Sequence, residues 1–149
     1  MCLFDPKKVS PLTEDIKAYK VLLKEQDEQY DINEDVVYHS PYLFKKWKLG
    51  ERHSEESEDI IEEEIRLFGC IGAGVIHCYR SLQDAIDEKV YQELRDKGLR
   101  VPGEKLESDT YVIAEFIIPK DSKYVYLGTF GHKDDCYGAS DVIFNKIIL

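Results

Sequence analysis

The sequence predicts an α+β fold, in which one main helix at residues 82–97 packs on a mostly antiparallel, open or barrel-like sheet of about six strands. Short apolar segments bounded by Gly, Pro or polar residues recur along the chain, as strands do. Only one segment combines a helical period with start and stop signals. At 149 residues and 43% apolar composition, the chain has the size of one domain with its own core.

The first part of the chain predicts an arm followed by two strands. Pro6 and Pro11 interrupt residues 1–14, which we expect to form an irregular arm outside a single domain at 15–149. Apolar residues at 16–23 predict a strand. A shorter strand at 36–39 is expected to run up to Ser40, because the residue before a proline favours extended geometry.

The middle of the chain is less regular. Residues 42–47 hold an aromatic cluster, including Trp47, at a spacing compatible with one or two helical turns. Residues 51–59 predict a solvated loop. From 60 to 68 the apolar spacings of three and four favour a short helix, and a strand fits part of the same segment.

A strand that turns directly into a helix is the most informative feature. Residues 75–79 predict a strand that follows a glycine-rich stretch. Ser81 is a suitable N-cap with Asp84 three residues later. Apolar residues at 82, 85, 86, 90 and 94 then form one helical face, and Gly98 stands where a helix is expected to end.

The last part predicts three strands. Residues 111–118 are apolar on both faces apart from Glu115, so this strand is expected to be central and covered on both sides. Pro119 ends it. Further strands are expected at 124–127 and 142–149, with residues 129–140 forming a glycine-containing loop between them.

The net charge of −10 is concentrated in an acidic segment, residues 51–64, which holds eight acids and one arginine. No basic stripe suited to phosphates is visible, which argues against direct nucleic-acid binding. The acidic segment is either a solvated surface, a docking site for a basic partner or a nucleic-acid mimic. No apolar run approaches a membrane span and no signal peptide is recognisable, so we expect a cytoplasmic protein that does not bind membranes.

The cysteines do not predict a metal site or a nucleophile. His77, Cys78, His132 and Cys136 are suitable zinc ligands by type, but neighbours on a strand point to opposite faces. Two acids beside Cys136 would raise the pKa of its thiol. We therefore expect free thiols, and no metal or cofactor.

Strand ends beside helix starts often bind ligands in α/β proteins. The hypothesised ligand face joins six residues at such places: His39, Ser40, His77, Tyr79, Arg80 and Tyr137. The tyrosines would stack on a flat ligand, and the arginine would contact an anionic group. The expected partner is a small anionic or nucleotide-like ligand, or a protein; the oligomeric state stays open.

Two resemblances add to this interpretation. The segments 74–85 and 112–119 resemble a Gly-x-His/Tyr-x-x-x-Ser-x-x-x-Ala unit, followed by a Val-x-x-x-x-Ile-Pro strand, in small uncharacterised domains of gut bacteria and their phages. Tyr38-His39-Ser40 and Gly74–Ala85 resemble elements of His-Tyr type ADP-ribosyltransferases. That resemblance implies that His39 and Ser40 contact the NAD ribose and that Tyr79 stacks on nicotinamide. Asp141 is the acid beside Ser140, where the family places a catalytic glutamate.

The sequence thus leaves three hypotheses. The first is a cytosolic ligand- or protein-binding module without catalysis of its own. The second is an NAD-using transferase that employs the same face. The third is a partner-docking or nucleic-acid-mimic role carried by the acidic segment at 51–64.

Overall fold

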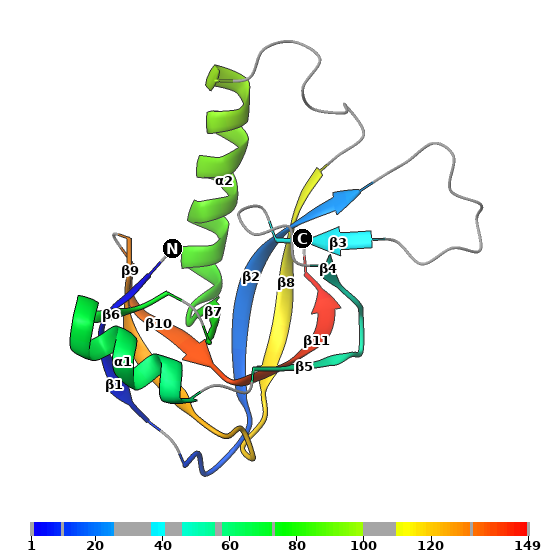
Figure 1. Cartoon of the computed structure of the whole chain (residues 1–149). Helices are drawn as coiled ribbons and strands as arrows, with labels where there is room; N and C mark the ends of the chain where they lie inside the picture. Colours follow the sequence, from blue (N-terminus) through cyan, green and yellow to red (C-terminus); the bar gives the residue numbers. More distant parts are fainter. Residues whose placement is uncertain are drawn as a thin grey trace.

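The computed structural model describes residues 2–9, 11–25, 37–40, 46–55, 58–72, 74–99, 110–131 and 133–148. Within these ranges the chain forms a curled sheet and two helices, α1 (Glu58–Phe68) and α2 (Leu82–Leu99) (Figure 1). The strands are β1 (Leu3–Lys8), β2 (Ile16–Glu25), β3 (Val37–His39), β4 (Lys46–Trp47), β5 (Arg52–Ser54), β6 (Cys70–Ile71), β7 (Ile76–Tyr79), β8 (Thr110–Ile118), β9 (Val125–Phe130), β10 (Lys133–Ala139) and β11 (Asp141–Ile147).

All strand pairings among the described residues are antiparallel, which confirms the predicted sheet type. The main path is β5-β11-β8-β2-β7-β10-β9-β1-β6, and it curls into a half-barrel (Figure 1). β3 joins the side of β2 and carries β4. The prediction of about six strands is wrong, because nine described strands lie on the main path alone.

β8 is the central strand that the sequence predicted. It lies between β11 and β2, and its residues 111–116 are all buried. Glu115, the polar exception, is only 5% exposed. Its Oε2 accepts a 2.6 Å hydrogen bond from Asn145 Nδ2 on the neighbouring β11, which offsets part of the cost of burying a carboxylate.

Each face of the sheet carries its own core. The face called here the helix face holds α1 and α2 over a cluster that includes Tyr79 and Ile113. The opposite face holds a second cluster around Trp47 and Phe144. Alternation along each strand sends successive side chains to the two faces, so position within a strand decides which core a residue joins.

β1 corrects the expectation of an irregular arm at 1–14. Proline cannot donate to a ladder, which is why Pro6 suggested a break. In the structure the register of β1 with β9 shifts between Phe4 and Lys7, and Asp5 adopts a φ of 48°. This bulge takes Pro6 out of the regular ladder, so the strand continues past it.

β10 corrects the expectation of a loop at 129–140. Its Gly138, and Gly128 of β9, make room on the helix face for the fully buried side chain of Leu3. A Cβ atom at Gly128 would lie 2.8 Å from Leu3 Cγ, and one at Gly138 would lie 3.0 Å from Leu3 Cδ2. These glycines therefore allow close packing inside strands and do not mark turns.

α2 confirms the predicted main helix. Its first turn is capped by Ser81, whose Oγ accepts a 3.1 Å hydrogen bond from the backbone N–H of Asp84. Ala85 is fully buried against the sheet. The helix continues to Leu99, so Gly98 lies inside it and not beyond its end; a glycine in a helix costs about 1 kcal/mol or less.

α1 resolves the ambiguity at 60–68 in favour of a helix and begins inside the predicted loop at 51–59. Ile61 is fully buried, and Ile65 packs on the same cluster one turn later. Residues 52–54 of that segment are not irregular either, because they form β5, which pairs with β11. The loop prediction failed because the pairing partner of β5 lies far away in the sequence.

β3 confirms the second predicted strand. Trp47, expected in a helical turn, instead lies in β4, where it is paired with Tyr38 of β3. Residues 42–45 of the same predicted segment lie outside the described ranges. β2 pairs with β3 near its end and with β7 at one described position, Tyr19 opposite Tyr79.

Candidate functional site

Three of the predicted ligand-face residues lie on or beside β7. His77 and Tyr79 point to the helix face, where their rings lie 5.5 and 5.9 Å from the ring of Phe130, centroid to centroid. Arg80 follows the strand and is exposed, with Nη1 3.5 Å from Asp135 Oδ2. The structure therefore brings these three residues together, but the charge of Arg80 is already offset in part by Asp135.

The other predicted residues lie elsewhere. Tyr137 is buried in the cluster of the opposite face. Ser40 Oγ accepts a 2.7 Å hydrogen bond from Nε1 of Trp47, which belongs to that same cluster. The backbone of His39 pairs with Leu23 of β2, and its side chain lies outside the described part of the structure. The sheet thus separates Ser40 and Tyr137 from His77 and Tyr79.

The His77 ring is largely enclosed. Its Nε2 atom is buried and has no hydrogen-bond partner among the described residues. Burial, and after it the ammonium of Lys20, lower the pKa of His77 to about 4, although a hydrogen bond with the Ile71 backbone opposes the shift. The imidazole is therefore neutral at pH 7 and offers no positive charge to an anionic ligand.

Lys20 is a polar residue of the sheet that the sequence analysis did not single out. Its Nζ donates a 2.5 Å hydrogen bond to the backbone carbonyl of His77 and lies 5.6 Å from the centroid of the Trp47 ring. Since β2 and β7 pair at a single described position, this lysine adds a second connection between the two strands. The available sequence signal was a lysine in the middle of the predicted strand at 16–23, next to the apolar run 21–23.

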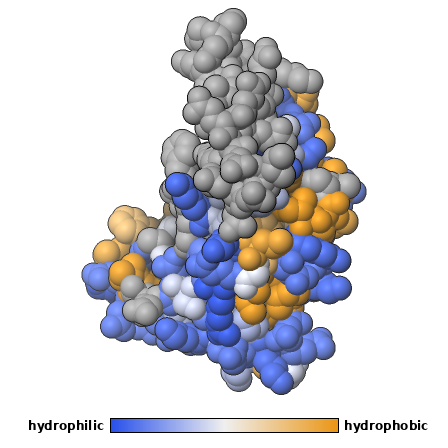
Figure 2. Space-filling view, turned by 90° about the vertical axis from the view of Figure 1, so that its right-hand side faces the viewer, coloured by the Kyte–Doolittle hydropathy of each residue, from blue (hydrophilic) through white to orange (hydrophobic). Residues whose placement is uncertain are grey.

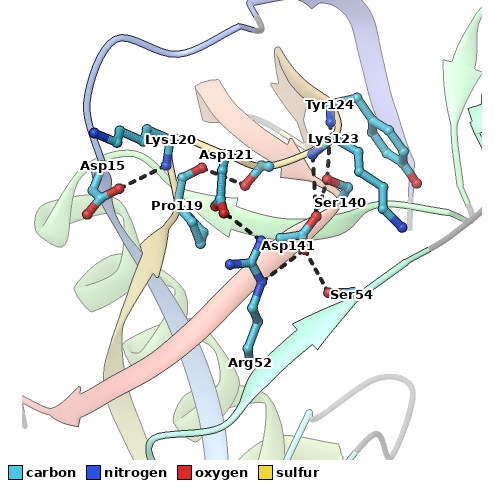
Figure 3. A network of polar contacts seen from close by, with 11 residues as sticks. Asp15, Arg52, Ser54, Pro119, Lys120, Asp121, Lys123, Tyr124, Ser140 and Asp141 are labelled. Carbon is cyan, nitrogen blue, oxygen red and sulfur yellow. Dashed lines mark hydrogen bonds and ion pairs between the residues drawn. The ribbon is translucent and has the colours of Figure 1, made fainter.

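A second polar cluster surrounds Asp141, which is buried at the start of β11 (Figure 3). Its Oδ2 accepts hydrogen bonds from Arg52 Nη2 at 2.9 Å, Arg52 Nε at 3.1 Å and Ser54 Oγ at 2.7 Å. Its Oδ1 accepts from Ser140 Oγ at 2.5 Å and from the Lys123 backbone N–H at 3.5 Å. Burial alone would raise the pKa of Asp141, but these hydrogen bonds outweigh it and hold the pKa below its ordinary value.

This cluster fastens β5, β11 and the turn before β9 to one another. Arg52 also reaches Asp121 Oδ1 at 3.2 Å, and Ser140 Oγ accepts from the Tyr124 backbone N–H at 3.1 Å. The side of the molecule that carries β5 and β11 is mostly hydrophilic in its lower part (Figure 2). Because both oxygens of Asp141 accept hydrogen bonds from the protein, the role of this carboxylate is to stabilise the fold.

The outward side of α1 combines apolar side chains with carboxylates. Ile60, Leu67 and Phe68 are 46%, 57% and 71% exposed. Ile60 and Leu67 are seven residues apart, so they lie in line two turns apart along the helix. We call the exposed side of the helix the α1 surface; it consists of Asp59, Ile60, Glu62, Glu63, Arg66, Leu67 and Phe68.

The inward side of α1 fixes the orientation of that surface. Ile61 is fully buried. Glu64 accepts a hydrogen bond from the backbone N–H of Gly72, after β6. At the other end Glu58 accepts a 2.6 Å hydrogen bond from Lys8 Nζ of β1. With contacts to β1, β6 and the core, the helix cannot roll to bury Ile60 and Leu67.

α2 also exposes apolar residues, but its acids are balanced by nearby cations. Lys133 Nζ of β10 lies 3.0 Å from Asp87 Oδ2 and 3.7 Å from Asp84 Oδ1. Within the helix Lys89 Nζ lies 2.8 Å from Glu93 Oε1. The exposed apolar residues there are Val90, Tyr91 and Leu94. α2 therefore provides an apolar surface without the excess negative charge of α1.

The described cysteines on β7 and β10 are poor nucleophiles. Burial raises the pKa of Cys78 to about 11 and that of Cys136 to about 12, so both thiols are protonated at pH 7. In the described part of the chain, no three His, Cys, Asp or Glu side chains gather in a way that would hold a metal ion. His132, considered in the sequence analysis, lies outside the described ranges.

Comparisons with protein-family models, curated proteins and solved structures find no match to this chain. Of the helices that the structure describes, none has the length and apolar character needed to cross a membrane. The geometry of the described residues is therefore the basis for a functional proposal.

Proposed function

We propose that this protein is a protein-binding module whose α1 surface docks a basic, amphipathic segment of a partner protein. The observation that carries the proposal is the line formed by Ile60 and Leu67, with Phe68 at its end, on a helix flanked by carboxylates. Apolar side chains that stay exposed together commonly mark a protein interface.

The apolar residues supply the affinity in this proposal. Fully burying a leucine, isoleucine or phenylalanine side chain contributes about 1.5–3 kcal/mol. The three apolar residues of the α1 surface are each about half exposed or more, so a partner would remove much of this area from water. Because α1 is held in place by the core, little ordering entropy opposes docking.

The carboxylates supply the preference for a basic partner. α1 holds five acids and one arginine. Lys8 pairs with Glu58, and Arg66 lies 3.7 Å from Glu63, but Asp59 and Glu62 form no ion pair with any residue that the structure describes. Cations on a partner would complement these charges, which favours rapid association and selects against acidic partners.

The other two hypotheses gain less support from the placement of their residues. A small-ligand face and an NAD site both require Ser40 and Tyr79 to approach one ligand, and the two residues lie on opposite sides of the sheet. The acid beside Ser140 is Asp141, which is occupied by Arg52 and Ser54.

A labelled amphipathic helical peptide of leucine and lysine tests the proposal by fluorescence anisotropy. We expect the peptide to bind and Leu67→Ser to weaken binding about tenfold, as loss of an interface anchor does. Leu94→Ser is the matched control, because Leu94 is exposed to a similar extent on α2, and it should leave binding unchanged. Equal binding to wild type and Leu67→Ser would contradict the proposal.

Charge is tested separately, because any acidic protein attracts a cationic peptide. A scrambled peptide of the same composition, without an apolar face, should bind at least about tenfold more weakly. Asp59→Lys/Glu62→Lys should abolish binding of the amphipathic peptide. The control Glu14→Lys/Glu51→Lys changes the net charge equally at exposed positions off the α1 surface, and it should retain binding. If both charge variants lose binding equally, the attraction is not local to α1.

A further inference from the structure

Cys2 and Cys70 form a thiol pair where β1 meets β6. Phe4 lies opposite Cys70 and Leu3 lies opposite Ile71 in this antiparallel pair. Directly opposed residues share a face, and so do residues two positions apart on a strand. Cys2 therefore lies on the same side of the pair as Cys70, diagonally across from it.

The register brings the two side chains close enough to interact. Interaction with Cys2 is the largest cause that raises the pKa of the Cys70 thiol. The neighbouring Gly72 leaves space beside them, since a Cβ atom there would lie 3.5 Å from Cys2 Sγ. Cys2 is half-buried and Cys70 is buried, so solvent reaches the pair from the Cys2 side.

We propose that Cys2 and Cys70 are a redox-active pair that forms a reversible disulfide with hydrogen peroxide as the oxidant. This proposal does not depend on the proposed docking function. It assigns a modification site to the junction of β1 with β6, directly after the C-terminal end of α1.

The reaction has two balanced steps. The Cys2 thiolate attacks one peroxide oxygen, the O–O bond breaks, and the hydroxide that leaves takes a proton to become water, which leaves a sulfenic acid on Cys2. The Cys70 sulfur then attacks the Cys2 sulfur, the S–O bond breaks, and the departing hydroxide takes the Cys70 proton as water. Two thiols are oxidised to one disulfide, and one peroxide is reduced to two waters. A dithiol reductant reverses the change by exchange.

The order of attack follows from the environments of the two thiols. Interaction with Cys2, and after it burial, raise the pKa of the Cys70 thiol, and the charge of Glu64 adds to this. Because the thiolate is the nucleophile, a raised pKa makes Cys70 slow to attack free peroxide. Its attack on a Cys2 sulfenic acid is favoured by proximity, since the two groups are held on neighbouring strands. The more exposed Cys2 is therefore the first to react.

Cys78 and Cys136 provide a control pair inside the same protein. They lie on the paired strands β7 and β10, but Cys78 is opposite Tyr137 and Cys136 is opposite Tyr79. The two cysteines therefore point to opposite faces, and both are almost fully buried. Peroxide should leave this pair reduced.

The test treats the reduced 149-residue chain with one equivalent of hydrogen peroxide and measures its intact mass. We expect the loss of two hydrogen atoms without added oxygen. A tryptic digest should then contain a peptide linked through Cys2 and Cys70; because the second peptide also holds Cys78, its fragment ions must place the bond at Cys70. Closing a loop of about 70 residues should raise the melting temperature by about 10 °C, reversibly with dithiothreitol.

Single cysteine-to-serine substitutions show which two residues form the disulfide. Cys2→Ser should abolish the intramolecular bond, and this half-buried position tolerates the change without loss of the fold. Cys78→Ser and Cys136→Ser should each leave the bond intact. The proposal is overturned if Cys2 instead gains oxygen atoms and remains unlinked, if Cys2 is linked to Cys78 or Cys136, or if the main product is a linked dimer.

Discussion

Two buried polar groups of the same sheet, Asp141 and His77, have opposite relations to their surroundings. Each oxygen of Asp141 accepts at least two hydrogen bonds, from Arg52 and Ser54 on one side and from Ser140 and Lys123 on the other. His77 has a hydrogen bond with the Ile71 backbone and a buried Nε2 atom that has no hydrogen-bond partner in the described structure. The pKa is lowered in both cases, but hydrogen bonding is the cause for Asp141 and desolvation for His77.

This difference teaches that burial alone does not decide whether a charge is tolerated. Asp141 is stabilised in its charged form because donors replace the water it has lost. Protonation would place an N–H on both ring nitrogens of His77, and no described acceptor replaces the water around Nε2. His77 is therefore stabilised only in its neutral form. The two groups therefore resist acid in different pH ranges, and the following experiments separate them.

The largest expected effect comes from Asp141→Ala. The substitution leaves Ser54, Ser140 and a backbone N–H without their acceptor, and it removes the buried one of the two carboxylates that Arg52 contacts. We expect a loss of about 3 kcal/mol in the free energy of unfolding, measured by urea denaturation. Asp121→Ala is the matched control: Asp121 contacts the same arginine but is 71% exposed at its side chain, and it should cost less than about 0.5 kcal/mol.

The second effect is the acid sensitivity caused by His77. The pKa of His77 is about 4 in the folded protein, against an ordinary value of 6.5. Between these two pH values the unfolded state therefore binds more protons than the folded state. Stability is fully present above pH 6.5 and falls as the pH drops toward 4, by about 3 kcal/mol in total. The loss from Asp141 comes later, as its carboxylate protonates below its ordinary pKa of 3.8.

His77→Asn tests this assignment, because an asparagine keeps a donor for Ile71 but does not titrate. Unfolding free energies measured at several pH values from 7.5 to 4 should fall less steeply for the variant than for the wild type. Above pH 6.5 the two curves should run parallel. Parallel curves over the whole range would show that another group causes the acid sensitivity.

The smallest expected effect is that of Ser54→Ala. Asp141 Oδ2 keeps both hydrogen bonds from Arg52 when the 2.7 Å bond from Ser54 is removed. We expect a loss of about 1 kcal/mol, measured by the same urea denaturation. A loss as large as that of Asp141→Ala would mean that the donors around the carboxylate do not substitute for one another.

Sequence reasoning succeeded where local pattern determines structure. The apolar run of β8 and the cap and period of α2 are strong enough to fix both elements without knowledge of their neighbours. β1 and β10 were missed because their stability comes from distant contacts. Pro6 is accommodated by a bulge against β9, and Gly128 and Gly138 serve the side chain of Leu3. Neither relation is visible in a local window.

The candidate site divides in the same way. Strand alternation correctly places His77 and Tyr79 on one face. Tyr137 faces the opposite core because it is paired with Cys78 in the sheet. Its segment was interpreted as a loop, so neither this pairing nor the face of Tyr137 could be predicted. The acidic segment was recognised from composition, but the exposure of Ile60 and Leu67 depends on which side of α1 meets the core, and Ile61 decides that.

The place of β1 in the sheet has a consequence for the order in which the sheet is completed. Phe4 lies opposite Cys70 of β6 on one side and Thr129 of β9 on the other, so β1 joins two segments that are far apart in the sequence. Until β9 is in place, Leu3 lacks its close packing against Gly128 and Gly138. The half-barrel therefore closes late in folding, at the slow rate typical of non-local strand pairing.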